Sequence, residues 1–341
     1  MSTRGNQKKV NLQAVADEAG VSRATASLVL RESPLVSAET RKRVIAAIHT
    51  LGYIYNRGAA NLRRQKTGTI GVVLSNIGSP FFSKLLLGID EVLVDASIVA
   101  LLVNSADNPE RQMRQIWRLR EHSVDGLIIC PAAGSDETLL SGIEKTGLPY
   151  VQVLRHVSQT AGDYVGPDYA GGTDLAVTHL VRHGRKRIVF LGGYPVNSAA
   201  CERLDGFQRA LRRHRLESDL IIPTDLDNLS DFGALESMMA SSSPPDAAIC
   251  YNDMVALSFM GKLLSEGALP GRDFAVIGAD NLPQAATSFP ALTTIVTDPA
   301  GVGRNAARLL LDRIAEPRVS NMRILVSGQL MVRESCGGPL P

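Results

Sequence analysis

The chain has 341 residues, of which 45% are hydrophobic and 21% are charged, and its formal net charge is +2. This length and apolar content predict a globular protein with two or three domains. Its four cysteines are scattered, without a Cys-x-x-Cys pair, which argues against a zinc site or a disulfide framework. The start lacks the apolar segment of a signal peptide, and no stretch reaches the length of a membrane span. We therefore expect a cytoplasmic protein.

The charges are distributed unevenly along the chain. Residues 1–67 contain 12 Lys or Arg and 4 Asp or Glu, a balance of +8, whereas the remainder contains 24 and 30, a balance of −6. A basic N-terminal segment before an acidic remainder predicts that only the first part meets a polyanion.

The basic segment begins with a pattern of short helices. Apolar residues at helical spacing predict a first helix that ends at Gly20, and Ser22 is a good N-cap for a second. At 100° per residue, one arc of the second helix carries Ala26, Val29 and Leu30. The opposite arc carries Arg23, Ala24, Ser27, Leu28 and Arg31. A third helix is predicted from Ser37 to Gly52. The outer arc of the second helix suits a DNA major groove, although a plain three-helix bundle with a basic face is the alternative.

The next segment, YNRGAANLRRQKTG at residues 55–68, predicts a hinge. Asn56 can cap a helix, but the helix would span barely two turns and would be unfolded by itself in water. Leu62 is an apolar residue among basic ones. A helix that folds only on DNA, with Leu62 as a minor-groove wedge, explains both features; a basic linker is the alternative.

Residues 10–73 resemble the head of lactose-repressor (LacI) family transcription factors, because the helix-turn-helix, third helix, LGY step, hinge and first body strand follow in order. The SLVL stretch and parts of the body are similar to the maltose regulon repressor branch. Leu28 stands where many members carry Arg, Ala26 where Val is usual and Tyr55 where Pro is usual, and Leu28 suggests a different operator preference. The DNA contacts that the resemblance implies are Ser22, Arg23, Ala24, Thr25, Ser27 and Leu28, with Asn56, Ala59 and Leu62 in the hinge.

Beyond Gly68, short Val- and Ile-rich runs alternate with helical stretches. The predicted strands are residues 69–74, 98–103, 126–130, 150–153, 187–192, 247–251, 274–278 and 293–297, with a last strand near 324–333. Such runs predict parallel sheets covered on both faces, and about 270 residues favour two doubly wound lobes over one sheet. The predicted domains are a head at 1–55, a hinge at 56–68, an N-terminal lobe at 69–165 plus 296–326, and a C-terminal lobe at 166–295 plus 327–336.

Polar residues gather after several predicted strands, where ligands of doubly wound sheets bind, although strand ends are often polar for reasons of turn chemistry alone. Motifs such as SNIGSPFF, ERLDGF, CYNDMVAL and VIGADN resemble the two-lobed sugar-binding body of the LacI family, which is shared with periplasmic binding proteins. The resemblance implies that effector contacts come from Phe81, Asp168, Asn197, Arg203, Asn252 and Asp280, and that the chain crosses between lobes near Asp168, Ile295 and Ser327.

The motifs of common enzymes, HExxH, GxSxG and the P-loop, do not occur, so we expect neither catalysis nor a cofactor or metal. We expect a regulator that binds a pseudo-palindromic operator as a homodimer. Its effector would be a sugar, with a purine as the alternative, and inducer and corepressor action both stay open. A sugar-binding protein without a DNA role is a further alternative.

Overall fold

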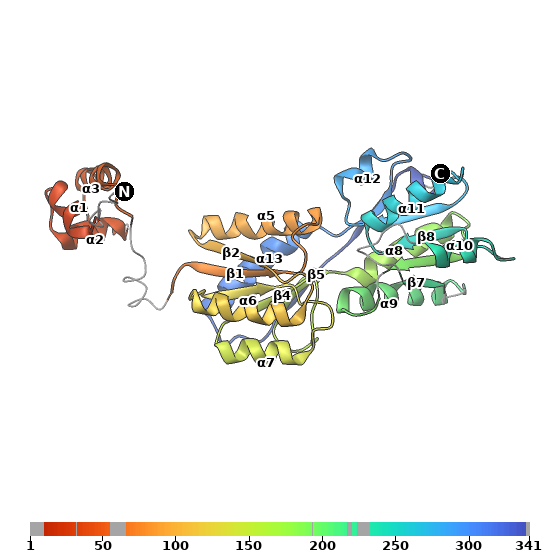
Figure 1. The fold of residues 1–341 in the computed structure, drawn as a ribbon, viewed down its shortest axis with the longest axis horizontal. Coiled ribbons are helices and arrows are strands. Elements are labelled where there is room, and N and C mark those ends of the chain that lie inside the picture. Colours follow the sequence, from red (N-terminus) through yellow and green to blue (C-terminus); the bar gives the residue numbers. More distant parts are fainter. Residues whose placement is uncertain are drawn as a thin grey trace, which may run out of the picture. The chain divides into compact units, whose positions relative to one another are not determined.

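The computed structural model describes residues 10–31, 33–54, 66–192, 194–216, 220–223 and 232–338. The chain divides between Thr67 and Gly68 into two compact units, a head and a body. The predicted hinge residues Asn56, Ala59 and Leu62 lie outside the described residues. The helical head and the α/β body, each drawn in Figure 1, confirm the predicted fold class.

The head contains three helices, α1 (Leu12–Glu18), α2 (Arg23–Leu30) and α3 (Ala38–Leu51). Each begins at a polar cap, since the side chains of Asn11, Ser22 and Ser37 accept a backbone hydrogen bond from the first turn of their helix. The small core between the helices is formed by Val15, Ala16, Ala19, Ala26, Val29, Val44 and Ala47. The apolar spacing in the sequence therefore closes one core, as predicted.

The first lobe of the body is a six-stranded sheet in the order β11-β5-β4-β3-β1-β2. All of its pairs are parallel. Its strands are β1 (Thr69–Leu74), β2 (Val99–Asn104), β3 (Gly126–Ile129), β4 (Tyr150–Val153), β5 (Asp163–Pro167) and β11 (Arg323–Val326). Helices α5 (Pro80–Asp95) and α13 (Pro299–Ala315) cover one face, and α6 (Pro109–Glu121) and α7 (Glu137–Thr146) cover the other (Figure 1).

The second lobe repeats this plan in the order β12-β10-β9-β8-β6-β7. Its strands are β6 (Ile188–Gly192), β7 (Ile221–Pro223), β8 (Ala247–Cys250), β9 (Ala275–Ala279), β10 (Thr293–Val296) and β12 (Gln329–Met331), of which only β12 pairs antiparallel. Helices α8 (Tyr169–Arg182) and α9 (Ser198–Arg213) cover one face, and α11 (Asp253–Ser265) packs on the other. The shorter helices are α10 (Gly233–Met239), α12 (Pro283–Thr287) and a 3₁₀ turn (Glu334–Cys336).

The strand predictions were incomplete. The eight predicted runs all contain strands, but β5 and β7 were not predicted. The prediction of a single last strand near 324–333 was wrong, because this segment forms two strands, β11 in the first sheet and β12 in the second. A strand could not continue through Ser327 and Gly328, since the chain leaves one sheet for the other at that point.

The chain passes between the two sheets three times. The crossings lie between β5 and α8, between β10 and α13, and between β11 and β12. Two of them touch, because the backbone amide of Asp168 donates to the carbonyl of Val326 at 2.8 Å. The three crossings therefore connect the lobes side by side, and each lobe contains segments that are distant in sequence.

Close helix packing in each lobe depends on glycine. A Cβ on Gly88 of α5 would lie 2.1 Å from the carbonyl oxygen of Ala300 in α13, and one on Gly206 of α9 would lie 2.5 Å from that of Ala170 in α8. Both distances are far shorter than a normal contact, so glycine lets the backbones of each helix pair approach. Among the described residues, none of the helices has the length and apolar character that crossing a membrane requires.

Candidate DNA-binding helix and effector site

Helix α2 presents the side chains that sequence analysis assigned to DNA. Ser22, Arg23 and Ala24 are exposed at its start, whereas Ala26 and Val29 are buried, as their positions on the helix predict. Ser27 and Leu28 are partly exposed. The start of α2 thus offers a cation and small side chains to a partner.

Hydrogen bonds fix the start of this helix. The Ser22 hydroxyl accepts from the Thr25 amide at 3.0 Å and lies 2.8 Å from the Thr25 hydroxyl. Arg41 of α3 donates to the carbonyl of Ser33 at 2.7 Å, while Lys42 and Arg43 are exposed. Ser22 therefore has a structural role in capping besides any contact with DNA.

The body contains a buried guanidinium between two tyrosine rings. The Cζ atom of Arg203, on α9, lies 3.8 Å from the ring centroid of Tyr169 and 4.5 Å from that of Tyr251. Arg203 is only 6% exposed, and one of its nitrogens donates to the carbonyl of Ala199 at 3.3 Å. Contacts with both rings restrict the orientation of the planar group.

Asp280 is a buried acidic residue that interacts electrostatically with Arg203. Burial raises the pKa of Asp280, whereas Arg203, the Thr297 hydroxyl and Lys84 lower it. The residue directly follows β9 and has a φ of 105°, a backbone conformation that residues other than glycine rarely adopt. Its amide donates to the carbonyl of Ile295 at 2.8 Å. The carboxyl end of β9 thus holds a buried carboxyl in a strained backbone, which is a common feature of binding sites.

A second buried carboxyl, that of Asp253, forms hydrogen bonds with the segments on either side of this region. It accepts the Thr294 hydroxyl at 2.5 Å and the Leu282 amide at 2.7 Å. Burial raises the pKa of Asp253 to about 7, against the lowering effect of these two hydrogen bonds. One oxygen of Asp253 accepts from the loop after β9 and the other from β10. Asp253 therefore fixes the backbone around Asp280 rather than offering a free carboxylate.

The first lobe contributes basic residues to the same region. Lys84 of α5 donates to the carbonyl of Asn281 at 3.2 Å, across the lobes. Arg155, after β4, donates to Asp107 at 2.6 Å within the first lobe. Because Lys84 also interacts electrostatically with Asp280, residues of both lobes border the region around Asp280.

The structure brings together only part of the predicted effector set. Arg203 and Asp280 are both buried and interact electrostatically. Asp168, Asn197 and Asn252 each use a side-chain oxygen to cap a helix, respectively α8, α9 and α11, although the amide nitrogens of Asn197 and Asn252 keep their donors. Asp168 also lines a surface hollow of about 520 Å³ formed by α8 and α9 residues. Phe81 is 8% exposed and packs in the core of the first lobe.

Two residues next to Arg203 were missed by sequence reasoning. Tyr169 directly follows Asp168, and Tyr251 directly precedes Asn252, so both stand beside residues that were proposed. Their aromatic character at the ends of β5 and β8 was the available signal. Within the described part of the chain, no three His, Cys, Asp or Glu side chains are placed to hold a metal ion.

Comparisons with known proteins agree with this architecture. Residues 11–56 match the family "Bacterial regulatory proteins, lacI family", and residues 177–336 match the "Periplasmic binding protein-like domain". The HTH-type transcriptional repressor PurR of Aliivibrio salmonicida is 30% identical over 324 residues, which are 94% of this chain and 97% of PurR. The maltose regulon regulatory protein MalI of Escherichia coli is also 30% identical, over 84% of this chain and 83% of MalI.

Solved structures extend the likeness to the fold of both units. The Lac repressor dimer bound to operator and the anti-inducer ONPF has a TM-score of 0.85 at 27% identity, covering 96% of this chain and 99% of that one. The complex of the transcriptional regulator CelR with cellobiose has a TM-score of 0.73 at 30% identity, with the same coverage. The chain therefore belongs to the lacI family of bacterial regulatory proteins and is a DNA-binding transcriptional regulator.

Proposed function

We propose that this regulator is a repressor whose affinity for its operator changes when a polyhydroxylated small molecule, most simply a sugar, binds between the lobes. The observation that carries the proposal is the Arg203–Asp280 pair. A buried guanidinium beside a buried carboxyl can donate to and accept from neighbouring hydroxyls, and the tyrosines provide apolar surface nearby.

A purine is the second candidate effector, because PurR is as similar to this chain as MalI is. The same Arg203 and Asp280 side chains offer a donor and an acceptor to a purine edge. The relatives that the chain matches are transcriptional regulators and not enzymes, and we propose no catalytic role, cofactor or metal for this protein, which we place in the cytoplasm.

On DNA, we propose that α2 reads the operator through Ser22, Arg23, Ala24, Thr25, Ser27 and Leu28. The exposed Arg23 is the side chain best suited to a guanine edge, and Ala24 and Leu28 suit a thymine methyl group. Substitution of Arg23 by Ala should weaken binding to the preferred operator and relax its sequence preference, as measured by selection from random DNA. A uniform loss over all sequences would contradict this reading.

We propose that the protein acts as a homodimer. Large apolar side chains are exposed on α5 and on the edge strand β2, namely Leu87, Val94, Val99 and Leu102. A second copy would cover them and place two heads on the half-sites of a pseudo-palindrome. Sedimentation of the wild type and of Leu87→Glu tests this, since the charge should shift the mass towards that of one chain.

For regulation, we propose that effector binding moves the lobes and changes the hinge at residues 56–68, including Asn56, Ala59 and Leu62. Effector and operator must then alter each other's affinity by the same factor. An inducer would lower operator affinity and a corepressor would raise it, so a titration of operator DNA with and without effector decides the sign.

The first experiment is a thermal-shift screen of the full chain against monosaccharides, disaccharides, polyols and purines. A compound that binds the folded state raises the melting temperature by mass action. We expect one sugar class to do so for the wild type and for Asp205→Asn, which breaks only an exposed ion pair with Arg209. The shift should be lost in Arg203→Ala and Asp280→Asn. A purine hit would replace the sugar, and a hit that survives both substitutions would refute the site.

A further inference from the structure

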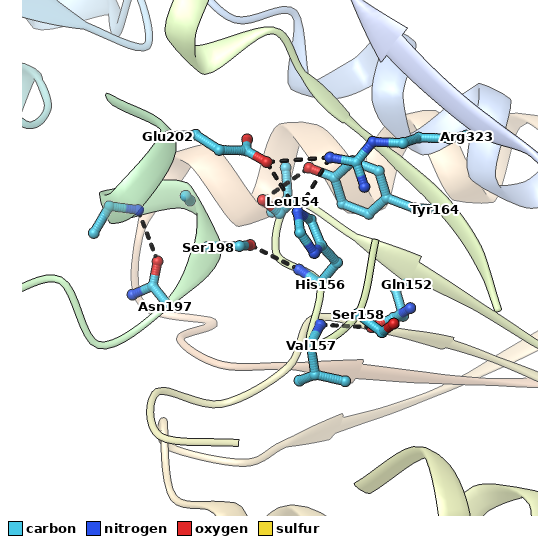
Figure 2. Close-up of polar contacts among 12 residues, drawn as sticks. Gln152, Leu154, His156, Val157, Ser158, Tyr164, Asn197, Ser198, Glu202 and Arg323 are labelled. Carbon is cyan, nitrogen blue, oxygen red and sulfur yellow. Dashed lines mark hydrogen bonds and ion pairs between the residues drawn. The ribbon is translucent and has the colours of Figure 1, made fainter. Parts of the chain in front are cut away.

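Two polar contacts of Glu202, a hydrogen bond with His156 and an ion pair with Arg323, join the lobes beside the proposed effector site (Figure 2). His156 Nε2, after β4, lies 2.9 Å from Glu202 Oε1 on α9, and Arg323 Nη2, at the start of β11, lies 3.1 Å from the same oxygen. The backbone amide of His156 also donates to the Ser198 hydroxyl at 2.8 Å. Two first-lobe side chains and one first-lobe amide thus converge on the first two turns of a second-lobe helix.

Packing restrains the first-lobe partners. Tyr164 of β5 is buried and bonds through its hydroxyl to the carbonyl of Leu154 at 3.3 Å. The Cζ atom of Arg323 lies 4.3 Å from the Tyr164 ring centroid, and the His156 ring meets the same ring edge-on at 4.9 Å. The side chains of His156 and Glu202 are only 7% and 23% exposed. This ion-pair cluster is therefore partly removed from water, where charge interactions are stronger than at an open surface.

The geometry makes Glu202 the shared acceptor. His156 Nε2 lies within 3.1 Å of both an acceptor, Glu202, and a donor, Arg323, and one nitrogen cannot accept from Arg323 while it donates to Glu202. If Nε2 carries the proton, both His156 and Arg323 donate to Glu202. The shared carboxylate then keeps His156 Nε2 and Arg323 Nη2 3.1 Å apart. Without the carboxylate, two first-lobe donors would face each other with no second-lobe acceptor between them.

Glu202 is adjacent to Arg203, so one turn of α9 bears both the interlobe ion pairs and the effector guanidinium. Successive helix residues point about 100° apart, which directs Glu202 to the first lobe and Arg203 to Tyr169, Tyr251 and Asp280. Helix α9 is held rigidly against α8, where Gly206 meets the backbone of Ala170. A shift between the lobes at Glu202 must therefore move Arg203, or the ion pairs must break.

We propose that Glu202, held by His156 and Arg323, is a latch that fixes the lobes in the arrangement seen here and positions Arg203 for effector. The positioning role rests on the proposed function, whereas the latch itself does not. Breaking the latch should loosen the lobes, which the three crossings and the Lys84–Asn281 hydrogen bond still connect, without removing any group from the proposed effector site. Operator response and lobe position should then change together.

The test uses the full chain with Glu202→Gln, which keeps the size of the side chain and removes its charge, and Arg323→Gln, which removes the other partner. The matched control is Asp205→Asn on the same helix, which loses an exposed pair within α9. Amide hydrogen exchange of the His156 amide, which bonds across the lobes to Ser198, reports lobe separation without any ligand. We expect about tenfold faster exchange in both latch variants, as the loss of a hydrogen bond to a charged group implies, and none in the control.

Solution scattering of the same proteins should show a larger radius of gyration for the latch variants at unchanged circular dichroism. Exchange and scattering equal to those of Asp205→Asn would refute the latch, whatever the effector screen finds. If the latch variants respond as expected but Arg203→Ala still binds every compound that the wild type binds, the latch stands and the proposed effector site falls.

Discussion

The two lobes share a strand order but bury their charges in different places. In the first lobe, the buried carboxylate of Asp163 forms a two-pronged ion pair with Arg313, at 2.8 and 2.9 Å, and also accepts the Met322 amide at 2.8 Å. In the second lobe, Arg203, Asp253 and Asp280 are buried at or beside the carboxyl ends of strands. In the described part of the chain, no ion pair of that closed kind joins Arg203 to Asp280.

This difference separates a structural role from a binding role. The Asp163–Arg313 pair connects β5, α13 and the segment before β11, and all of its geometry is used within the first lobe. We propose that Arg203 and Asp280 instead serve a ligand, since they lie where doubly wound sheets bind ligands. Removing one partner of a buried ion pair is costly to a fold, while buried charges without such a pair are candidates for a binding role.

The largest expected effect is on the first lobe. Arg313→Ala should lower the free energy of unfolding by about 3–5 kcal/mol, because it leaves the Asp163 carboxylate buried without its cation. Arg304→Ala on the same helix removes a pair with Glu91 that is far more exposed, and should cost at most about 1 kcal/mol. Urea denaturation measures both. Equal costs would erase the structural role given to the Asp163–Arg313 pair.

Asp253 in the second lobe should have a smaller effect on the free energy of unfolding. Its pH dependence should be opposite to that of a paired carboxylate. Its pKa of about 7 when folded exceeds the ordinary 3.8, so the folded state holds the proton more tightly. The stability from this group is fully present below the ordinary pKa and is lost as the pH rises towards 7. At about 1.4 kcal/mol per unit, Asp253→Asn should remove about 3 kcal/mol of the decline in the free energy of unfolding between pH 5 and 8.

Urea denaturation at pH 5 and pH 8 checks this, because Asn can still accept the Leu282 amide and donate to the Thr294 hydroxyl. If the free energy of unfolding changed equally with pH in the wild type and in Asp253→Asn, the Asp253 carboxyl would be charged throughout this range. The two lobes would then differ less than the burial of their charges suggests.

Where the lobes pack alike, they should respond alike. Gly88→Ala and Gly206→Ala each force a methyl group against the backbone of a neighbouring helix and should cost about 1–3 kcal/mol in thermal or chemical unfolding. Gly261 of α11 has open space around its Cβ position, so Gly261→Ala should instead stabilise by up to about 1 kcal/mol. If Gly261→Ala lowered the free energy of unfolding as much as the other two substitutions, the cost would come from replacing a helical glycine in general rather than from close helix packing.

Sequence reasoning was most successful where a pattern is local. The three head helices follow from apolar spacing and polar caps, and the Val- and Ile-rich runs mark the central strands. Strand β5 was missed because DYVGP contains Gly166 and Pro167, and it becomes a strand only by pairing with β4 and β11. Strand β7 has three residues, too few for any periodicity.

For the proposed effector site, the sequence offered candidate residues but not the direction of each side chain. Arg203 and Asp280 were assigned through family motifs; in the structure both are buried and interact electrostatically, and their effector role stays a prediction. Asp168, Asn197 and Asn252 follow strands or loops in the same way, yet each caps a helix, which a sequence cannot distinguish from a ligand contact. The tyrosines around Arg203 depend on the meeting of α8, α9 and β8, which no local pattern records.

The three crossings between the sheets also set the order in which the protein can fold during its synthesis. The first lobe lacks α13 and β11 until the ribosome has made residues 299–326, because these elements come after nearly the whole second lobe. Until then the face of α5 that packs on α13, with Leu85 and Ile89, is uncovered. The nascent chain must carry an unfinished first lobe through most of translation, so a stalled or truncated product exposes an apolar surface that chaperones and proteases recognise.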